Sequence, residues 1–436
     1  MTSPSLSIYT HGQPGFEAAL TALVRRGDTD LERVEIAVRQ ILQDVRREGD
    51  AAVFRYVQRF EQRQPDRLLI TDYGGAEALE MLPAPLRKAL TVAADRIRRY
   101  HARQKEQLAT FEYVEDGVTL SSRVTPVQRA GIYAPGGKAS YPSSVLMSAV
   151  PAQVAGVAEI YVASPDTSVE VRAACHLAGV TALVDCGGAQ AIAALAYGTE
   201  SIPAVDKIVG PGNIYVAAAK RLVFGQVDID SIAGPSEILV LADDSADPEV
   251  VAADLLSQAE HAEDAYALLL ALGQGVAEAV NAAVQRQLAA LPELDERGRP
   301  RRIIAEQSIA NNGAAFTVKD LDQLVSWANQ LAAEHVSVQT RDARAVADRV
   351  LRAGALFVGH NTPEAAGDYL AGPSHVLPTG GAVRFGAPLG VYNFVSRTSL
   401  ISYERSALQA QAENITTFAR AEGLEAHARA VEVRLK

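Results

Sequence analysis

The alternation of apolar and polar residues divides the chain into a helical beginning, a middle of short strands and helices, and a helical end. Near the start, Ala37, Ile41 and Val45 recur every four residues, as on one face of a helix, and Gly49 follows as a stop signal. The highly charged segment 86–107 predicts a long, solvated helix. The first hundred residues therefore read as helical.

From residue 159 onward, the pattern changes to short apolar runs that are each followed by a helical segment. The runs are 159–164, 180–186 and 207–209, and the helical segments end at Gly179, Gly198 and Gly225. Strand and helix in this order, with short connections, predict βαβ units around a parallel sheet. Since the crossovers are right-handed, the glycine turns between them should lie at the carboxyl edge of that sheet.

A second alternation of strands and helices follows between residues 237 and 358. Strands are predicted at 237–242, 268–272, 336–339 and 355–358, and helices from Asp247-Pro248 and over 321–332. After about residue 390 the pattern is helical again, mainly over 406–435. A tail of about 45 residues is too short for a core of its own, so we expect it to pack on this chain or on a partner subunit.

These patterns predict an α/β protein in four parts, two of them larger domains built on parallel sheets. We expect a helical N-terminal extension at 1–28, an α/β domain formed jointly by 29–131 and 237–388, a second α/β domain at 132–236, and a helical C-terminal tail at 389–436. Neither the G-x-G-x-x-G fingerprint nor the G-x-x-x-x-G-K-[ST] loop occurs anywhere in the chain.

Composition narrows the range of partners. With 41 Lys and Arg against 52 Asp and Glu, the net charge is −11, and no basic stripe indicates nucleic acid. Two cysteines provide neither a disulfide framework nor a thiolate zinc finger, which suggests a reducing compartment. The start lacks a signal-peptide pattern, and the most apolar stretch, 265–272, is shorter than the ~18–20 residues that span a bilayer. We therefore expect a cytoplasmic protein without nucleic-acid or membrane partners.

Three glycine turns open helical segments, at 134–137, 187–190 and 210–213. A helix N-terminus leaves unpaired backbone N–H groups, which suit an anion such as a pyrophosphate. Gln190 and Asn213 add side-chain amides near two of these turns. Because glycine turns between strand and helix are also common as plain connections, both interpretations stay open.

Without thiolates, a metal ion would need histidine, carboxylate or amide ligands. Gln258 and His261 lie three residues apart at the end of a predicted helix and share a face, which suits two ligands of one metal. Asp368 lies in a predicted loop, and His427 lies in the tail. Histidine, aspartate and a neutral amide suit Zn²⁺, and also Mn²⁺ or Co²⁺. By spacing alone, His375 is as good a candidate as His427.

Glu334 and His335 follow the predicted helix 321–332 and precede a strand. An adjacent acid and imidazole can divide two proton transfers, one group activating water and the other acting as general base. A histidine at a helix C-terminus also interacts favourably with the helix dipole, so a structural role remains open.

Several long motifs closely resemble the histidinol dehydrogenase family, and together they span nearly the whole chain. They lie at 141–157, 187–225, 232–243, 254–261, 367–381 and 421–431. The resemblance implies a Rossmann-like fold that lacks the glycine fingerprint. It also implies a zinc-dependent homodimer that uses two NAD⁺ to oxidise L-histidinol, through L-histidinaldehyde, to L-histidine in histidine biosynthesis. One departure is Ala333, where the family usually has a proline with its fixed φ.

The resemblance also implies roles for individual residues. Glu334 and His335 look like the catalytic pair. In domain terms, 132–236 would bind NAD⁺, while 29–131 and 237–388 would carry the metal and catalytic residues. The zinc ligands would be Gln258, His261 and Asp368 of one subunit with His427 from the partner's tail. The substrate contacts would be these four ligands together with His335, Ser236 and Glu422. The NAD⁺ contacts would be Tyr133, Gln190 and Asn213.

Other functions remain to be weighed against this one. A related zinc-dependent dehydrogenase of another amino alcohol or of a sulfonated diol would keep the metal and catalytic residues. A zinc hydrolase could use Glu334 to activate a metal-bound water, but it would not explain the glycine turns with Gln190 and Asn213. A non-catalytic metabolite sensor would not need the catalytic pair.

Overall fold

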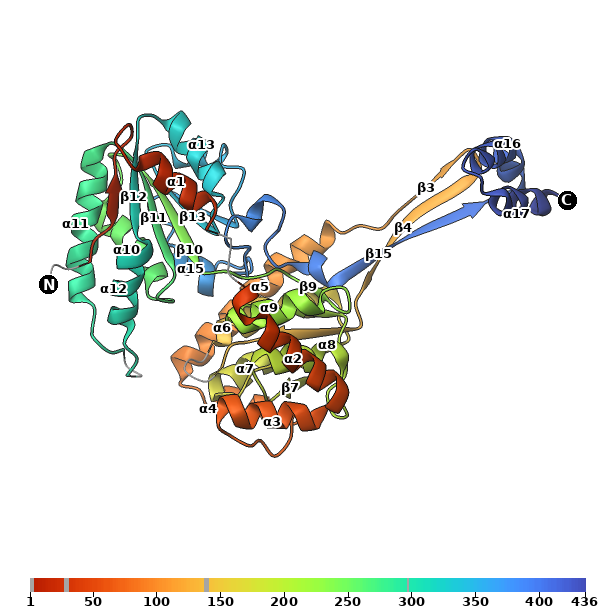
Figure 1. Cartoon of the computed structure of the whole chain (residues 1–436), viewed down its shortest axis with the longest axis horizontal. Coiled ribbons are helices and arrows are strands. Elements are labelled where there is room, and N and C mark those ends of the chain that lie inside the picture. Colours follow the sequence, from red (N-terminus) through yellow and green to blue (C-terminus); the bar gives the residue numbers. More distant parts are fainter. Residues whose placement is uncertain (1–3, 27–30, 137–140, 296–297) are drawn as a thin grey trace.

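The computed structural model describes residues 4–26, 31–136, 141–295 and 298–436, and in this part of the chain the strands form two six-stranded sheets and one three-stranded sheet. Each six-stranded sheet carries helices on both faces, and the two resulting α/β domains lie side by side (Figure 1). The three-stranded sheet projects from them as an arm that ends in a pair of helices, with the C-terminus at its tip.

The first domain, here called the discontinuous domain, is built on a parallel sheet, as the alternation of strands and helices predicted. Its central strands are buried on both faces. Its strand order is β1 (Ser7–Tyr9), β12 (Ala314–Val318), β11 (Tyr266–Leu272), β10 (Glu237–Ala242), β13 (His335–Gln339), β14 (Ala355–Val358). One face is covered by α10 (Pro248–Ala259), α11 (Gln274–Ala290) and α12 (Arg301–Asn312), and the other by α1 (Phe16–Val24), α13 (Leu321–Leu331) and α14 (Ala343–Ala347). The short α15 (Glu364–Tyr369) follows β14.

The second domain, here called the central domain, has the strand order β2 (Leu69–Ile70), β7 (Ala182–Val184), β6 (Glu159–Ala163), β5 (Arg129–Tyr133), β8 (Lys207–Val209), β9 (Asp228–Ile229). All pairs are parallel except β2 with β7. One face holds α2 (Glu32–Glu48), α3 (Asp50–Glu61), α8 (Gly188–Tyr197) and α9 (Ile214–Val223), and the other α4 (Gly75–Met81), α5 (Ala84–Glu106), α6 (Pro142–Ala155) and α7 (Val169–Leu177). Since the chain runs from β5 to β6 and β7 on one side and later to β8 on the other, the order reverses between β5 and β8.

The packing differs from the predicted division of the chain in two places. The helices of segment 29–131 cover the sheet of the central domain, not that of the discontinuous domain, because the apolar face of α2, with Val38 and Val45, packs against α8 and α9. At the start of the chain, β1 pairs with β12, so the segment predicted as a helical extension at 1–28 also supplies an edge strand. The predicted boundary near residue 28 lies outside the described residues.

The arm replaces part of the predicted helical tail with a strand. β15 (Val395–Tyr403) pairs with β4 (Val118–Pro126), which pairs with β3 (Phe111–Glu115), all antiparallel. Most of β15 is solvent-exposed, and it lacks the alternation that marks a half-buried strand. The short 3₁₀ turns at Ala382–Arg384 and Val391–Phe394 precede it.

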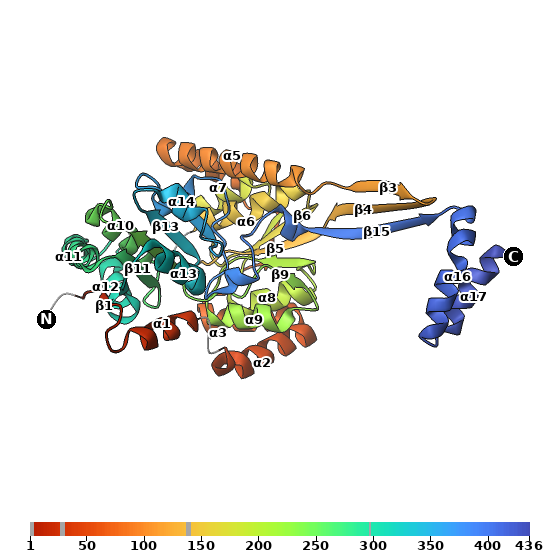
Figure 2. The ribbon, with the colours of Figure 1, turned by 90° about the horizontal axis from the view of Figure 1, so that it is seen from above.

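The end of the chain is helical, as predicted. α16 (Arg405–Ala421) and α17 (Glu425–Leu435) pack on each other at the tip of the arm, away from both domains (Figure 2). Among the described helices, none combines the length and apolar character that crossing a membrane requires.

Candidate active site

The candidate site lies at the amino edge of the sheet of the discontinuous domain. β10 begins at Glu237 and β13 begins at His335, in parallel register. Because α10 follows β10 and runs back along the sheet, its end returns Gln258 and His261 to the same edge. α15 likewise follows β14 and carries Asp368 to this edge. The name amino edge is used below for this cluster of strand starts and helix ends.

Glu334 and His335 are buried and are both held by Glu237. The main-chain N–H of Glu237 donates to Glu334 Oε2 (2.9 Å), and His335 Nδ1 lies 3.0 Å from the Glu237 carbonyl oxygen. Since a carbonyl only accepts, Nδ1 carries a proton and Nε2 of the neutral ring is the free base. Burial lowers the pKa of His335 to about 4, while burial and the Glu237 carboxylate raise the pKa of Glu334 well above its ordinary value. The imidazole is therefore a neutral proton acceptor.

Three of the four predicted metal ligands come together here. His261 Nδ1–H donates to the Ser257 carbonyl (3.0 Å), which leaves Nε2 facing Asp368 Oδ2 at 3.7 Å. The buried Gln258 Oε1 has no hydrogen-bond partner among the described residues. Asp368 also lies 3.5 Å from His375 Nδ1. Although burial raises the pKa of Asp368, the two histidines hold it below its usual range, so this carboxylate is anionic.

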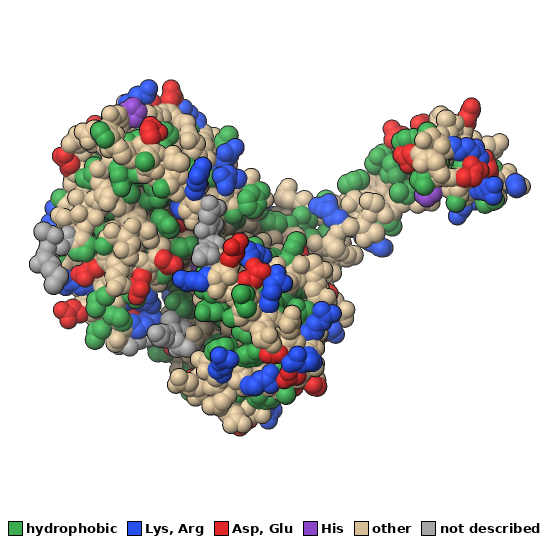
Figure 3. Space-filling model, viewed as in Figure 1, with side chains coloured by type: hydrophobic (Ala, Val, Ile, Leu, Met, Phe, Trp, Pro, Cys, Tyr) green, Lys and Arg blue, Asp and Glu red, His purple; other side chains and the backbone are tan. Residues whose placement is uncertain are grey.

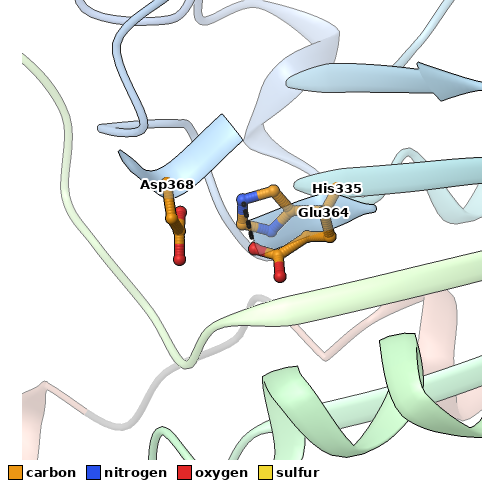
Figure 4. Close-up of side chains that lie close together, drawn as sticks. All are labelled: His335, Glu364 and Asp368. Carbon is orange, nitrogen blue, oxygen red and sulfur yellow. Dashed lines mark ion pairs between the residues drawn. The ribbon is translucent and has the colours of Figure 1, made fainter. Parts of the chain in front are cut away.

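Glu364 is part of the same cluster and was not singled out in the sequence. Its Oε1 lies 3.7 Å from His335 Nε2, and its Oε2 accepts the Ser257 hydroxyl (3.2 Å). Burial, with the charge of Asp368, raises its pKa to about 7. His335, Glu364 and Asp368 offer ligand atoms within 4.8 Å of one another, and Figure 4 shows their side chains together. The only sequence cue was the spacing of four between Glu364 and Asp368, which places them on one helix face.

The predicted dinucleotide contacts lie at the carboxyl edge of the central sheet, here called the switch edge. Tyr133 ends β5, and Asn213 follows β8, so the two flank the point where the strand order reverses. In open α/β sheets, that point is where ligands bind. The Tyr133 hydroxyl accepts the N–H of Gly188 (3.1 Å), and Asn213 Oδ1 caps the first N–H groups of α9. Gln190 Oε1 is buried and has no hydrogen-bond partner among the described residues.

The glycine turns at the switch edge differ from the expectation of free backbone N–H groups. The N–H of Gly187 donates to Glu61 Oε1 (2.8 Å), and the N–H of Gly210 donates to Asp230 Oδ2 (2.8 Å). These acids come from the end of α3 and from the residue after β9, positions that no local pattern connects to the turns. A pyrophosphate would therefore compete with built-in carboxylates there. Part of the turn at 134–137 lies outside the described residues.

The remaining predicted contacts divide between the amino edge and the tail. Ser236 directly precedes β10 and is half-buried at the amino edge. Glu422 follows α16 and His427 lies in α17, at the far end of the arm and away from β13 (Figures 1 and 2). The structure of one chain thus brings Gln258, His261 and Asp368 together but leaves His427 apart, and it places His375 beside Asp368 instead.

The fold and this geometry define the class of the protein. It is an α/β protein of two sheet domains with a buried acid–imidazole pair beside clustered histidine, carboxylate and amide donors. The sequence model described as histidinol dehydrogenase matches residues 24–435.

Individual relatives agree with that match. The chain is 50% identical to a histidinol dehydrogenase of Syntrophotalea carbinolica over 97% of both chains, and 46% identical to one of Aromatoleum aromaticum that covers 100% of this chain and 99% of the relative. It superposes on the crystal structure of histidinol dehydrogenase from Elizabethkingia anophelis with a TM-score of 0.90 and 32% identity, covering 99% of this chain and 98% of that one. The chain therefore belongs to the histidinol dehydrogenase family, oxidoreductases of histidine biosynthesis, as the motifs predicted.

Proposed function

We propose that this protein oxidises L-histidinol to L-histidine in two NAD⁺-dependent steps, with L-histidinaldehyde formed in between. The observation that carries the proposal is the buried Glu334–His335 pair, oriented by one residue, Glu237, beside the donor cluster of the amino edge. Such a pair supplies the two different proton transfers that the two oxidations need.

The donors of the amino edge fit a zinc ion. Gln258 Oε1 is a buried oxygen without a partner among the described residues, His261 Nε2 faces the Asp368 carboxylate, and Asp368 is anionic. Imidazole nitrogen with carboxylate and amide oxygens is a donor set that zinc accepts. When bound, zinc would orient the imidazole and amino nitrogens of the substrate as a template. We propose His427 of a second subunit as the further ligand.

In the first oxidation, His335 takes the proton of the substrate alcohol at Nε2 while the substrate loses hydride. Its Nδ1–H stays fixed on the Glu237 carbonyl, so the ring accepts at one nitrogen only. In the second oxidation, Glu334 removes a proton from the water that adds to the aldehyde, and a carboxylate with a raised pKa is a stronger base for this task. After His335 has released its first proton to solvent, Nε2 accepts the hydroxyl proton of the hydrate as the second hydride passes to a second NAD⁺.

The switch edge fits the dinucleotide. Tyr133, Gln190 and Asn213 gather there, and the buried, unpartnered Gln190 Oε1 can accept a hydrogen bond from the cofactor. A bound NAD⁺ supplies the hydride acceptor. The residues of this edge would hold and orient the cofactor by side chains, because Glu61 and Asp230 already take backbone N–H groups of two turns.

We propose a homodimer in which each tail completes the partner's site. On the tail, Phe418, Leu424 and Val433 expose apolar side chains, and hydrophobic surface is visible on the arm and tail in Figure 3. A cleft of about 610 Å³ opens between the domains next to His261 and is lined by apolar side chains of α5 and α6, among them Leu90. An exposed apolar face and an open cleft with one apolar wall on the same chain favour mutual docking of two copies.

The test is NADH formation from histidinol, followed by absorbance with and without a chelator. We expect two NADH per histidinol and loss of activity on chelation. The two free cysteines are buried, consistent with a reducing compartment such as the cytoplasm. Activity with another amino alcohol or a sulfonated diol but not with histidinol would overturn the proposed substrate, and activity without NAD⁺ would overturn the reaction class.

A further inference from the structure

A buried ion pair lies directly behind the catalytic pair. Arg26, just after α1, forms a two-pronged contact with Glu237, Nε to Oε1 at 3.0 Å and Nη2 to Oε2 at 2.5 Å. Both side chains are 1% exposed. Arg26 Nη1 also donates to the carbonyl of Leu23 (2.7 Å). A buried ion pair is tolerated only when its geometry is good and its other donors and acceptors are satisfied, as they are here.

Glu237 uses its polar groups on the catalytic pair and on the loop that passes it. Its carboxylate accepts the main-chain N–H of Glu334 (3.2 Å) and of Gly380 (2.6 Å). Its own N–H and carbonyl bind the Glu334 carboxylate and His335 Nδ1. One residue therefore determines where the Glu334 carboxylate lies and which nitrogen of His335 is free.

We propose that Arg26 and Glu237 are positioning residues for both oxidation steps, with the arginine fork fixing the Glu237 carboxylate and Glu237 fixing Glu334 and His335. The inference rests on the catalytic roles proposed above. Neither residue needs to touch substrate, and Arg26 contributes from the start of the chain, 211 residues from its partner. Without Arg26, the carboxylate of Glu237 would be left without its charged partner in the protein interior and would lose the two donors that fix it beside the N–H of Glu334.

The first variant is Arg26→Met, which keeps an apolar stem and removes the fork. The matched control is Arg25→Met, since Arg25 is exposed and its side chain makes no hydrogen bond or ion pair within the described part of the chain. The measurements are kcat and KM for histidinol and separately for histidinaldehyde, per zinc-loaded subunit, at a temperature well below each variant's melting temperature. We expect kcat of both steps to fall about 10- to 100-fold, as for a small misplacement of catalytic groups, while KM for histidinol changes little and the control matches wild type.

A second variant keeps the test decisive if the first does not fold. In Arg26→Met/Glu237→Gln, no unpaired charge is buried, so the melting temperature recovers. In the wild type, however, different oxygens of Glu237 accept these groups, Oε2 the N–H of Glu334 and Oε1 the N–H of Gly380. The amide replaces one of these oxygens by an NH₂ donor, so one of the two contacts is lost. We expect kcat of both steps to stay about tenfold or more below wild type. Arg26→Lys, which restores the charge with a single donor group, should recover part of the lost kcat.

Two results would overturn the inference. One is a folded Arg26→Met or double variant whose kcat equals that of wild type in both steps. The other is a rise in KM without a fall in kcat, which would place the pair in substrate binding. Failure of the proposed function is separate, because it would appear already in wild type and in Arg25→Met as the absence of two NADH per histidinol.

Discussion

The amino edge and the switch edge are built by the same βαβ rules but differ in whether their polar groups have hydrogen-bond partners. At the amino edge, Gln258 Oε1 and Glu364 Oε1 are buried without hydrogen-bond partners among the described residues. At the switch edge, the backbone donors of two turns are already bound by Glu61 and Asp230. The first edge is therefore left short of partners, in a way that suits a cation, whereas the second is largely satisfied before any ligand binds.

This difference indicates which edge carries out the chemistry and which edge binds the cofactor. Unpaired buried acceptors and displaced pKa values mark the amino edge as the place where protons and charges move. The switch edge has one unpaired buried acceptor, Gln190 Oε1, within the described residues, and otherwise offers shape at a strand-order reversal. Changes at the amino edge should therefore alter kcat, and changes at the switch edge should alter KM for NAD⁺.

The largest expected effect is that of Glu334→Gln. The amide cannot accept a proton from water, so oxidation of histidinaldehyde should fall about 1000-fold, within the range for a lost general base, while oxidation of histidinol to the aldehyde is largely spared. The measurement is NADH formed from each substrate. Glu278→Gln, on the exposed face of α11, is the control. His335→Asn should slow both steps, and equal loss of both steps in Glu334→Gln would contradict the division of labour.

The next effect concerns the ligand that completes the amino edge. His261→Asn and His427→Asn should each lower activity by about 100-fold or more, since even partners of metal ligands commonly cost up to that factor. Mixed dimers of the two variants contain one site with both histidines intact and should regain activity. If His427→Asn keeps its activity and His375→Asn loses it, the histidine beside Asp368 in the same chain is the ligand instead.

A smaller effect is expected at the switch edge. Gln190→Leu removes the buried acceptor and should raise KM for NAD⁺ about tenfold, the equivalent of one lost hydrogen bond. KM for histidinol and kcat at saturating NAD⁺ should change little, and titration of both substrates measures the split. A fall in kcat of similar size would show that the two edges are not separated in this way.

Part of this arrangement was accessible from the sequence because local patterns determine it. Apolar runs such as 237–242 predicted strands, and the spacing of Gln258 and His261 placed them on one helix face. The apolar stripe of α2 showed that the helix is buried but not against which sheet, and so segment 29–131 was assigned to the other domain.

The parts that were missed depend on contacts between distant segments. Arg26 and Glu237 meet across 211 residues, and Glu61 meets Gly187 across 126. A lone arginine at a helix end, or an acid at the end of another, carries no local sign of its partner. The choice between His375 and His427 is of the same kind, because it depends on a second copy of the chain.

The smallest expected effect concerns Asp44, a carboxylate with a structural role that contrasts with Glu334. The Asp44 carboxylate accepts the Tyr56 hydroxyl at 2.7 Å, and this hydrogen bond holds the pKa of Asp44 below its ordinary value. A carboxylate with a lowered folded pKa stabilises the fold above its ordinary pKa and loses that contribution as the pH falls through the folded value. Tyr56→Phe should therefore lower the melting temperature by about 2–4 °C near neutral pH, and by less as the pH falls below the ordinary pKa of an aspartate.

Tyr73→Phe is the matched control for this prediction. The Tyr73 hydroxyl donates to the Val180 carbonyl, which does not titrate. Loss of this hydrogen bond should therefore lower the melting temperature by an amount that stays the same as the pH falls. Thermal unfolding of the three proteins across acidic pH measures both differences. If the loss of melting temperature depends on pH in the same way in both variants, the assignment of Asp44 as a stabilising anion is contradicted. The pKa shifts of carboxylates would then be supported only at the amino edge.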